Sequence, residues 1–142
     1  MSHKIVLLIL LFIISIVFYF SWLPDPSLKS ETYLPNWLLK WSNQYYNLRT
    51  AIPFVAVGFL LEAYAHYKSL QEFNPKKINF LQNMGIAALI VCIAEGGQFL
   101  IHKRSPDIMD VFYGIIGSII GAIGYNLLKK NKKCETDINL PS

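Results

Sequence analysis

Four long stretches with almost no charged side chains dominate this sequence. They cover residues 5–23, 51–67, 80–99 and 111–128, which together make up about half of the chain. A helix that crosses a bilayer needs about 20 mainly apolar residues, within a range of about 17–25. Only 15% of the residues are charged, against about 25% in soluble domains. The sequence therefore predicts an all-α integral membrane protein, a bundle of four transmembrane helices in one domain over residues 1–128. It excludes a soluble domain, a disordered chain and a disulfide scaffold.

The distribution of basic residues predicts the orientation. An even number of spans places both termini on the same side, and lysine and arginine concentrate on the cytoplasmic side of a membrane. The two ends of the chain and the middle loop hold eight of these residues, whereas the other two loops hold five. We therefore expect both termini in the cytoplasm and the other two loops outside. Anionic membrane lipids attract the lysines of the basic tail, 129–142, so the net charge of +4 requires no nucleic-acid partner.

The first outer loop contains an amphipathic segment. At helical spacing its large apolar residues share one side, and they are Leu34, Trp37, Leu38, Trp41, Tyr45 and Leu48. A helix with tryptophan and tyrosine on its apolar side suits the headgroup layer of a membrane. The alternative is that this side packs on the protein's own bundle. Both interpretations place the helix on the outer surface.

Polar side chains gather around the turn between the third and fourth spans. An ionisable group in a spanning segment costs about 3 kcal/mol on insertion scales, so it normally faces the bundle interior and has a partner. Glu95 is such a group, and Gln98 and His102 share its face if the helix continues. The planar guanidinium of arginine is suited to pairing with a carboxylate. The candidate site comprises Arg49, Glu95, Gln98, His102, Arg104, Asp107 and Asp110.

The same residues have a structural interpretation, which the sequence leaves open. Asp107 and Asp110 fall in the first turns of a helix, where acidic side chains complement the macrodipole, and Arg104 would hold the hairpin closed. Glu95, His102 and the two aspartates include the side-chain types that bind metals. They lack the tight spacing of known metal motifs, so we expect no metal ion and no cofactor.

Two further patterns lie within the second and fourth spans. Gly114, Gly117 and Gly121 share a narrow face of the fourth span. Because glycine in a membrane helix usually lets a neighbouring backbone approach closely, we interpret this face as a packing surface. Glu62 and His66 form an i, i+4 pair on the second span. This span descends from the outer side, so Glu62 lies about 18 Å below Thr50, in the inner half of the membrane and away from the outer cluster.

These motifs together resemble the VanZ-like family. In that family the third helix ends in Glu-x-x-Gln, matched by Glu95 and Gln98, and a short loop follows with Arg-x-x-Asp-x-x-Asp, matched by Arg104, Asp107 and Asp110. The small-residue stripe of the fourth helix and the upstream stretch 49–61 also look like the family. The resemblance covers nearly the whole chain, and its specific part extends from residue 95 to residue 121.

The resemblance implies a multi-pass protein of the bacterial cytoplasmic membrane. Founding members of the family are associated with low-level resistance to teicoplanin, a glycopeptide that carries a fatty acyl chain, and no biochemical mechanism comes with that association. One position departs from the family pattern, since Gly114 stands where the family commonly has asparagine. A polar site that uses this amide would be altered here, whereas glycine is sufficient if the position only packs.

Two function hypotheses remain from the sequence. In the first, which we favour, the protein is a non-enzymatic or mechanistically undefined envelope protein. Its outer cluster then contacts a lipid-linked or anionic envelope component such as a cell-wall precursor or glycolipid, with membrane lipids around it. In the second, the protein is a small membrane enzyme acting on a lipid headgroup. Glu95 or Asp110 is then the general acid or base, His102 the proton shuttle and Arg104 the anion clamp. A homo-oligomer is left open, and a transporter is less favoured because four spans without inverted halves offer no pathway.

Overall fold

The computed structural model describes residues 2–23, 32, 34–71, 80–101 and 107–138, and it contains helices without strands in those ranges. The elements are α1 (His3–Ser21), α2 (Asn36–Gln44), α3 (Tyr46–Gln71), α4 (Phe80–Gly96), the 3₁₀ helix η1 (Gly97–Leu100) and α5 (Ile108–Ile138). Four segments are long and apolar enough to cross a membrane, namely His3–Ser21, Leu48–Leu70, Phe80–Leu100 and Ile108–Asn131. The prediction of an all-α bundle with four spans is confirmed, and the chain is a multi-pass membrane protein.

Three helix boundaries differ from the sequence prediction. The helix of the first loop ends at Gln44, and α3 already begins at Tyr46, so the loop is almost entirely helical before the second span. The third span changes from α-helix to 3₁₀-helix at Gly97, because the chain tightens there into its last turn. The helix of the fourth span, α5, continues to Ile138, so the first ten residues of the basic tail are part of the same helix.

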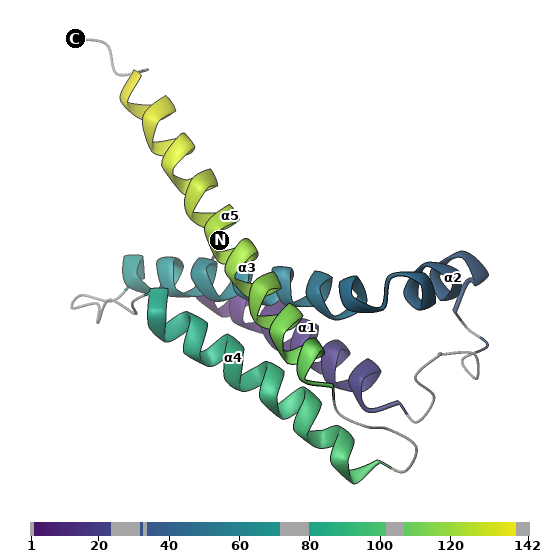
Figure 1. Ribbon diagram of the computed structural model, residues 1–142. Helices are drawn as coiled ribbons and strands as arrows, with labels where there is room; N and C mark the ends of the chain where they lie inside the picture. Colours follow the sequence, from purple (N-terminus) through teal and green to yellow (C-terminus); the bar gives the residue numbers. More distant parts are fainter. Residues whose placement is uncertain (1, 24–31, 33, 72–79, 102–106, 139–142) are drawn as a thin grey trace.

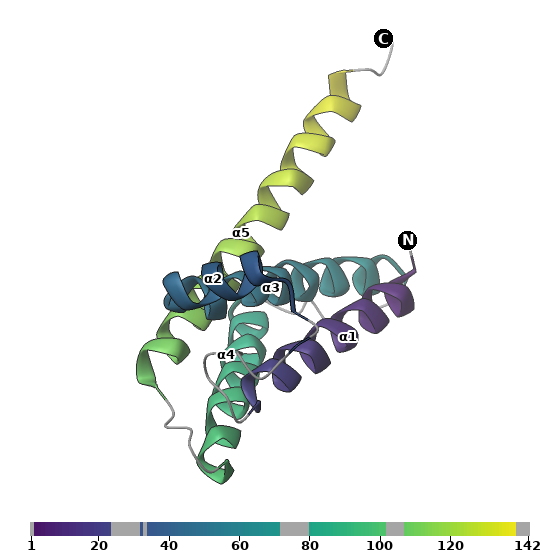
Figure 2. The same cartoon turned by 90° about the vertical axis from the view of Figure 1, so that its right-hand side faces the viewer.

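The four spans form a bundle from which the end of α5 projects. In Figure 1, α1 and α4 end toward the right of the view, where α3 begins, and α5 starts on the same side. We call this end of the bundle the site end, and the opposite end, with His3, Gln71 and Phe80, the tail end. The second half of α5 leaves the other helices in both views (Figures 1 and 2).

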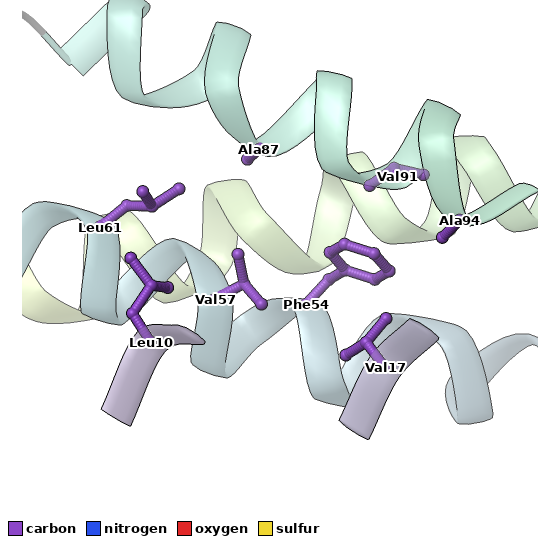
Figure 3. Packing of buried hydrophobic residues seen from close by; sticks show 8 residues of the cluster. All are labelled: Leu10, Val17, Phe54, Val57, Leu61, Ala87, Val91 and Ala94. Atoms are coloured by element: carbon purple, nitrogen blue, oxygen red, sulfur yellow. The ribbon is translucent and has the colours of Figure 1, made fainter. Parts of the chain in front are cut away.

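Small and branched apolar side chains fill the centre of the bundle. The buried cluster comes from three helices, as Figure 3 shows: Leu10, Val17, Phe54, Val57, Leu61, Ala87, Val91 and Ala94. Most of the large apolar side chains elsewhere on the spans point outward, as expected for a protein whose solvent is lipid. Close packing, rather than exclusion of water, therefore holds the helices against one another.

The most extensive packing joins α3 to α5, and glycine makes it close. A Cβ atom at Gly121 would overlap the carbonyl oxygen of Val55, and one at Gly117 would overlap that of Ala51. The contact is reciprocal, because a Cβ at Gly58 of α3 would meet the Ser118 carbonyl group of α5. Only the absence of a side chain lets the two backbones approach this closely.

Near the tail end, one hydrogen bond joins α3 to α4. The side-chain amide of Asn83 donates to Oε1 of Glu62 over 2.9 Å, and Asn83 is almost fully buried. The two rings beside it on α3, Phe59 and His66, both pack against Tyr125 of α5. Glu62 thus belongs to the packing of the bundle near the tail end, on a different level from Glu95.

Candidate functional site: a cavity at the site end

A cavity of about 230 Å³ opens at the site end, and residues of all five α-helices and of η1 line it. Its polar lining comes from Ser21, Ser42, Arg49, Thr50, Glu95, Gln98 and Asp110. Its apolar lining is formed by Ile16, Val17, Phe20, Leu34, Leu38, Trp41, Ile52, Pro53, Phe54 and Ala94. The lining therefore combines charged and hydrogen-bonding groups with hydrocarbon side chains.

The end of α1 is tied to the end of α4 beside this cavity. The hydroxyl of Ser21 and the indole N–H of Trp22 both donate to the carbonyl oxygen of Ala94, over 3.0 and 3.1 Å. The last carbonyl groups of an α-helix have no intrahelical donor, and α4 ends two residues later, at Gly96. A Cβ atom at Gly97 would overlap the Trp22 indole. The sequence at the end of α1 therefore caps the end of α4.

Glu95 is held by the 3₁₀ turn that follows it. The amide of Gln98 donates one hydrogen bond to Oε2 of Glu95 over 2.9 Å and another to Oγ of Ser21 over 3.1 Å. An amide nitrogen carries two hydrogens, so both bonds use its full donor capacity. Glu95 is 6% exposed and Gln98 is 2% exposed, so the carboxylate is fixed in place rather than free to reach solvent.

Asp110 is held in the same way from the opposite side. The hydroxyl of Thr50, at the start of α3, donates to Oδ1 of Asp110 over 2.9 Å. Asp110 is only 2% exposed, and it lies in the first turn of α5. Arg49 precedes Thr50 and lines the cavity with it. The described lining thus holds two buried carboxylates and one guanidinium, which together offer acceptors for donor groups and a fork of donors for an anion.

Ser42 contributes a buried hydroxyl with no partner among the described residues. It lies on α2, is 3% exposed and lines the cavity, and its Oγ makes no hydrogen bond there. A buried hydroxyl without a hydrogen bond is costly and rare in proteins. The Ser42 hydroxyl is therefore a candidate hydrogen-bonding group for a ligand in the cavity.

The structure brings together four of the residues singled out from the sequence. Arg49, Glu95, Gln98 and Asp110 line one cavity, and we call them the cavity cluster. Asp107 instead caps α5, because its Oδ1 accepts a hydrogen bond from the Met109 backbone N–H over 2.9 Å. His102 and Arg104 lie outside the described residues, and the proposal that they shuttle a proton or clamp an anion is not tested by the geometry.

The glycine positions divide between packing surfaces. Gly117 and Gly121 face the α3 backbone, as described above. At Gly114 a Cβ atom would lie 3.0 Å from the side chain of Val91 and 3.3 Å from that of Phe54. Gly114 is absent from the cavity lining, so this departure from the family pattern falls on an apolar contact and leaves the cavity cluster as it is.

The helix of the first loop forms the cover of the cavity with only part of its predicted apolar side. Leu34, Leu38 and Trp41 line the cavity, whereas Trp37 is 70% exposed and Tyr45 and Leu48 are also exposed. The cavity-facing side therefore packs on the protein's own bundle, and the exposed aromatic side chains suit the headgroup layer. Packing on the bundle is thus shown for the cavity-facing residues, whereas a place in the headgroup layer stays a prediction.

The sequence analysis missed polar residues in two places, Thr50 and Ser42 in the cavity lining and Asn83 near the tail end. Thr50 and Ser42 are small hydroxyl residues whose roles depend on partners or spaces contributed by distant segments. Asn83 carried a usable signal, since a polar side chain inside a long apolar run is expected to have a partner. No three histidine, cysteine or acidic side chains come together to form a metal site within the described part of the chain.

Comparison with known proteins gives one result beyond this geometry. Searches among curated proteins and among solved structures found no match. A family model described as VanZ/LLP1 matches residues 5–129, which include nearly all of the four spans and every described residue of the cavity lining. The chain therefore belongs to the VanZ/LLP1 family.

Proposed function

We propose that this protein is an envelope protein of the bacterial cytoplasmic membrane that binds the polar head of a lipid-linked or anionic envelope component in the site-end cavity. The observation that carries the proposal is the fixed arrangement of Arg49, Glu95 and Asp110 around one cavity within a membrane bundle. Charged groups at membrane depth are expensive, and they commonly mark a functional site.

The donors and acceptors of the cavity cluster support a head with more than one kind of polar group. Arg49 offers a planar set of N–H donors to a phosphate or carboxylate. Glu95 and Asp110, held by Gln98 and Thr50, offer acceptors that suit the hydroxyl or amine groups of a glycan. A lipid-linked cell-wall precursor or glycolipid carries both kinds of group.

The proposal includes an orientation. Both termini lie in the cytoplasm, and the site end faces outward, where envelope components are found. The support is the excess of basic residues at the termini and middle loop. In this orientation Trp37 of α2 and Tyr45, the residue after this helix, which are both exposed, lie at the depth of the outer headgroups.

Teicoplanin susceptibility gives a cellular test. We expect that producing the chain in a teicoplanin-susceptible bacterium raises the minimum inhibitory concentration, and that Glu95→Gln or Arg49→Gln removes the increase at equal membrane abundance. Glu62→Gln is the matched control, since it makes the same change at the tail end, outside the cavity lining. If both site variants raise the minimum inhibitory concentration as much as the wild type does, the cavity cluster has no role in this effect.

Retention of lipids by the purified protein tests binding independently of any drug. The protein is extracted from bacterial membranes and purified, and the lipids that remain bound to it are identified by mass spectrometry. We expect a species that co-purifies with the wild type and with Glu62→Gln but is depleted from Glu95→Gln and Arg49→Gln. Identical lipid profiles for all four proteins contradict the proposed binding. In the separate drug experiment, a wild-type protein that does not raise the inhibitory concentration of teicoplanin contradicts the link to susceptibility.

A further inference from the structure

The polar and apolar parts of the cavity occupy different depths. Along α1, Ile16 lies five residues before Ser21, which is about 7.5 Å at the rise of an α-helix. Along α3, Phe54 lies about 7.5 Å beyond Arg49 in the same direction. Along α1 and α3 the hydrogen-bonding groups therefore lie at the site end, and the apolar lining continues toward the middle of the bundle, while Leu38 and Trp41 of α2 add an apolar cover. This is the order of head and chain in a lipid of the nearer leaflet.

The cavity also has an edge toward the surrounding lipid. Ile16 of α1 and Ile52 of α3 both line it, and they are 39% and 50% exposed. α1 and α3 are neighbouring helices, so the cavity has lining side chains on two adjacent spans that the protein leaves partly uncovered. An uncovered apolar side chain on a membrane span is a surface that lipid can contact.

The volume of the site-end cavity suits one segment of a hydrocarbon chain. A cavity of 150 Å³ accommodates benzene, whereas pockets that enclose a whole drug-sized ligand measure about 300–1,000 Å³. The site-end cavity, at about 230 Å³, lies between these. It has room for one hydrocarbon segment beside the polar groups.

We propose that the ligand is an amphiphile that places one hydrocarbon chain in the cavity, against α1 and α2, and that Ser42 hydrogen-bonds the linkage between this chain and the head. The inference rests on the proposed function, because it assigns the head to the cavity cluster. Ser42 supplies the independent evidence, since its buried hydroxyl has no partner among the described residues and lies in the same lining as Leu38, four residues before it on α2.

Native mass spectrometry of the full chain, released from detergent micelles in the presence of dodecyl phosphate, tests this inference. We expect one dodecyl phosphate bound per wild-type chain. Leu38→Trp puts a larger side chain, from α2, into the space proposed for the hydrocarbon chain. It should weaken binding of dodecyl phosphate about tenfold, because an overfilled cavity forces its surroundings apart. Leu39→Trp is the matched control, since Leu39 is the neighbouring residue and is absent from the lining.

Two further variants separate the linkage from the head. Ser42→Ala should weaken binding about fivefold, the effect of one lost hydrogen bond, and Ser42→Thr should restore much of it. Arg49→Gln should weaken binding of both dodecyl phosphate and inorganic phosphate, because it removes the charge that faces the anion. All variants are first compared with the wild type for elution volume and melting temperature, so that a loss of folding is recognised.

Each outcome decides one of the two proposals. If Leu38→Trp binds dodecyl phosphate like the wild type while Arg49→Gln does not, the hydrocarbon chain of the ligand lies outside the cavity. The inference is then overturned, although binding of the head by the cavity cluster stands. An unchanged Ser42→Ala overturns the assigned linkage contact. If wild type and Arg49→Gln bind dodecyl phosphate equally, the cavity cluster does not hold the anionic head, and the proposed function fails in that form.

Discussion

The hydroxyl of Thr50 donates to the carboxylate of Asp110 across 2.9 Å, and this bond joins the first turns of α3 and α5 at the rim of the cavity. Sixty residues separate the two in the chain. The α3–α5 packing that begins here continues through Gly117 and Gly121. The same pair of helices thus positions the cavity cluster and forms the closest contact of the bundle.

Replacing Thr50 tests the energetic value of this bond. Thr50→Val keeps the shape of the side chain but removes the donor, so the buried carboxylate of Asp110 loses a hydrogen bond. We expect a loss of about 1–3 kcal/mol in the free energy of unfolding, measured by denaturant unfolding in detergent micelles. Thr50→Ser retains a hydroxyl and should stay near the wild type. Equal stability of the valine variant would show that Asp110 is satisfied without Thr50.

The glycine contacts predict a sharp difference within one helix. Gly121→Ala places a methyl group against the Val55 backbone, whereas Gly124→Ala meets open space. We expect the first to lower the melting temperature in detergent and to separate α3 from α5. The second should leave the melting temperature unchanged or raise it, because alanine favours a helix by about 1 kcal/mol over glycine. A similar effect of both substitutions would contradict the close backbone contact.

The tail-end pair predicts non-additive substitutions. Asn83→Leu leaves the Glu62 carboxylate without the amide that donates to it over 2.9 Å, so we expect a loss of about 1–3 kcal/mol in unfolding free energy. Adding Glu62→Leu to Asn83→Leu should recover part of this loss, since both polar partners are then replaced by apolar groups. A double-mutant cycle on unfolding free energies measures the coupling, and additive losses would argue against a direct interaction.

The proposed orientation predicts which thiols a membrane-impermeant reagent can reach. In a background with Cys92 and Cys134 changed to serine, a cysteine at Trp37 or Met109 should react in intact cells, because both positions are exposed at the site end. A cysteine at Lys130, near the tail end of α5, should react only after the cells are opened. The reverse pattern would place the cavity on the cytoplasmic side.

The sequence by itself determined the helices that cross the membrane. Long apolar runs without charge can satisfy their backbone hydrogen bonds in lipid only as helices, so the four spans follow from composition and length. Glu95, Gln98 and Asp110 were identifiable for a related reason, since polar groups at the ends of such runs need partners. The glycine stripe could be interpreted as a packing face because glycine has one main use inside a membrane helix.

The tertiary structure decided which segments meet. The Thr50–Asp110 and Ser21–Gln98 bonds join residues far apart in the chain, and no local pattern encodes such pairs. The site-end cavity exists because the helices that line it leave space between them. The size of that space depends on the geometry at which the helices cross. Helix propensity and hydropathy act over one or two turns, whereas the shape of a space is set by the side chains of several helices at once.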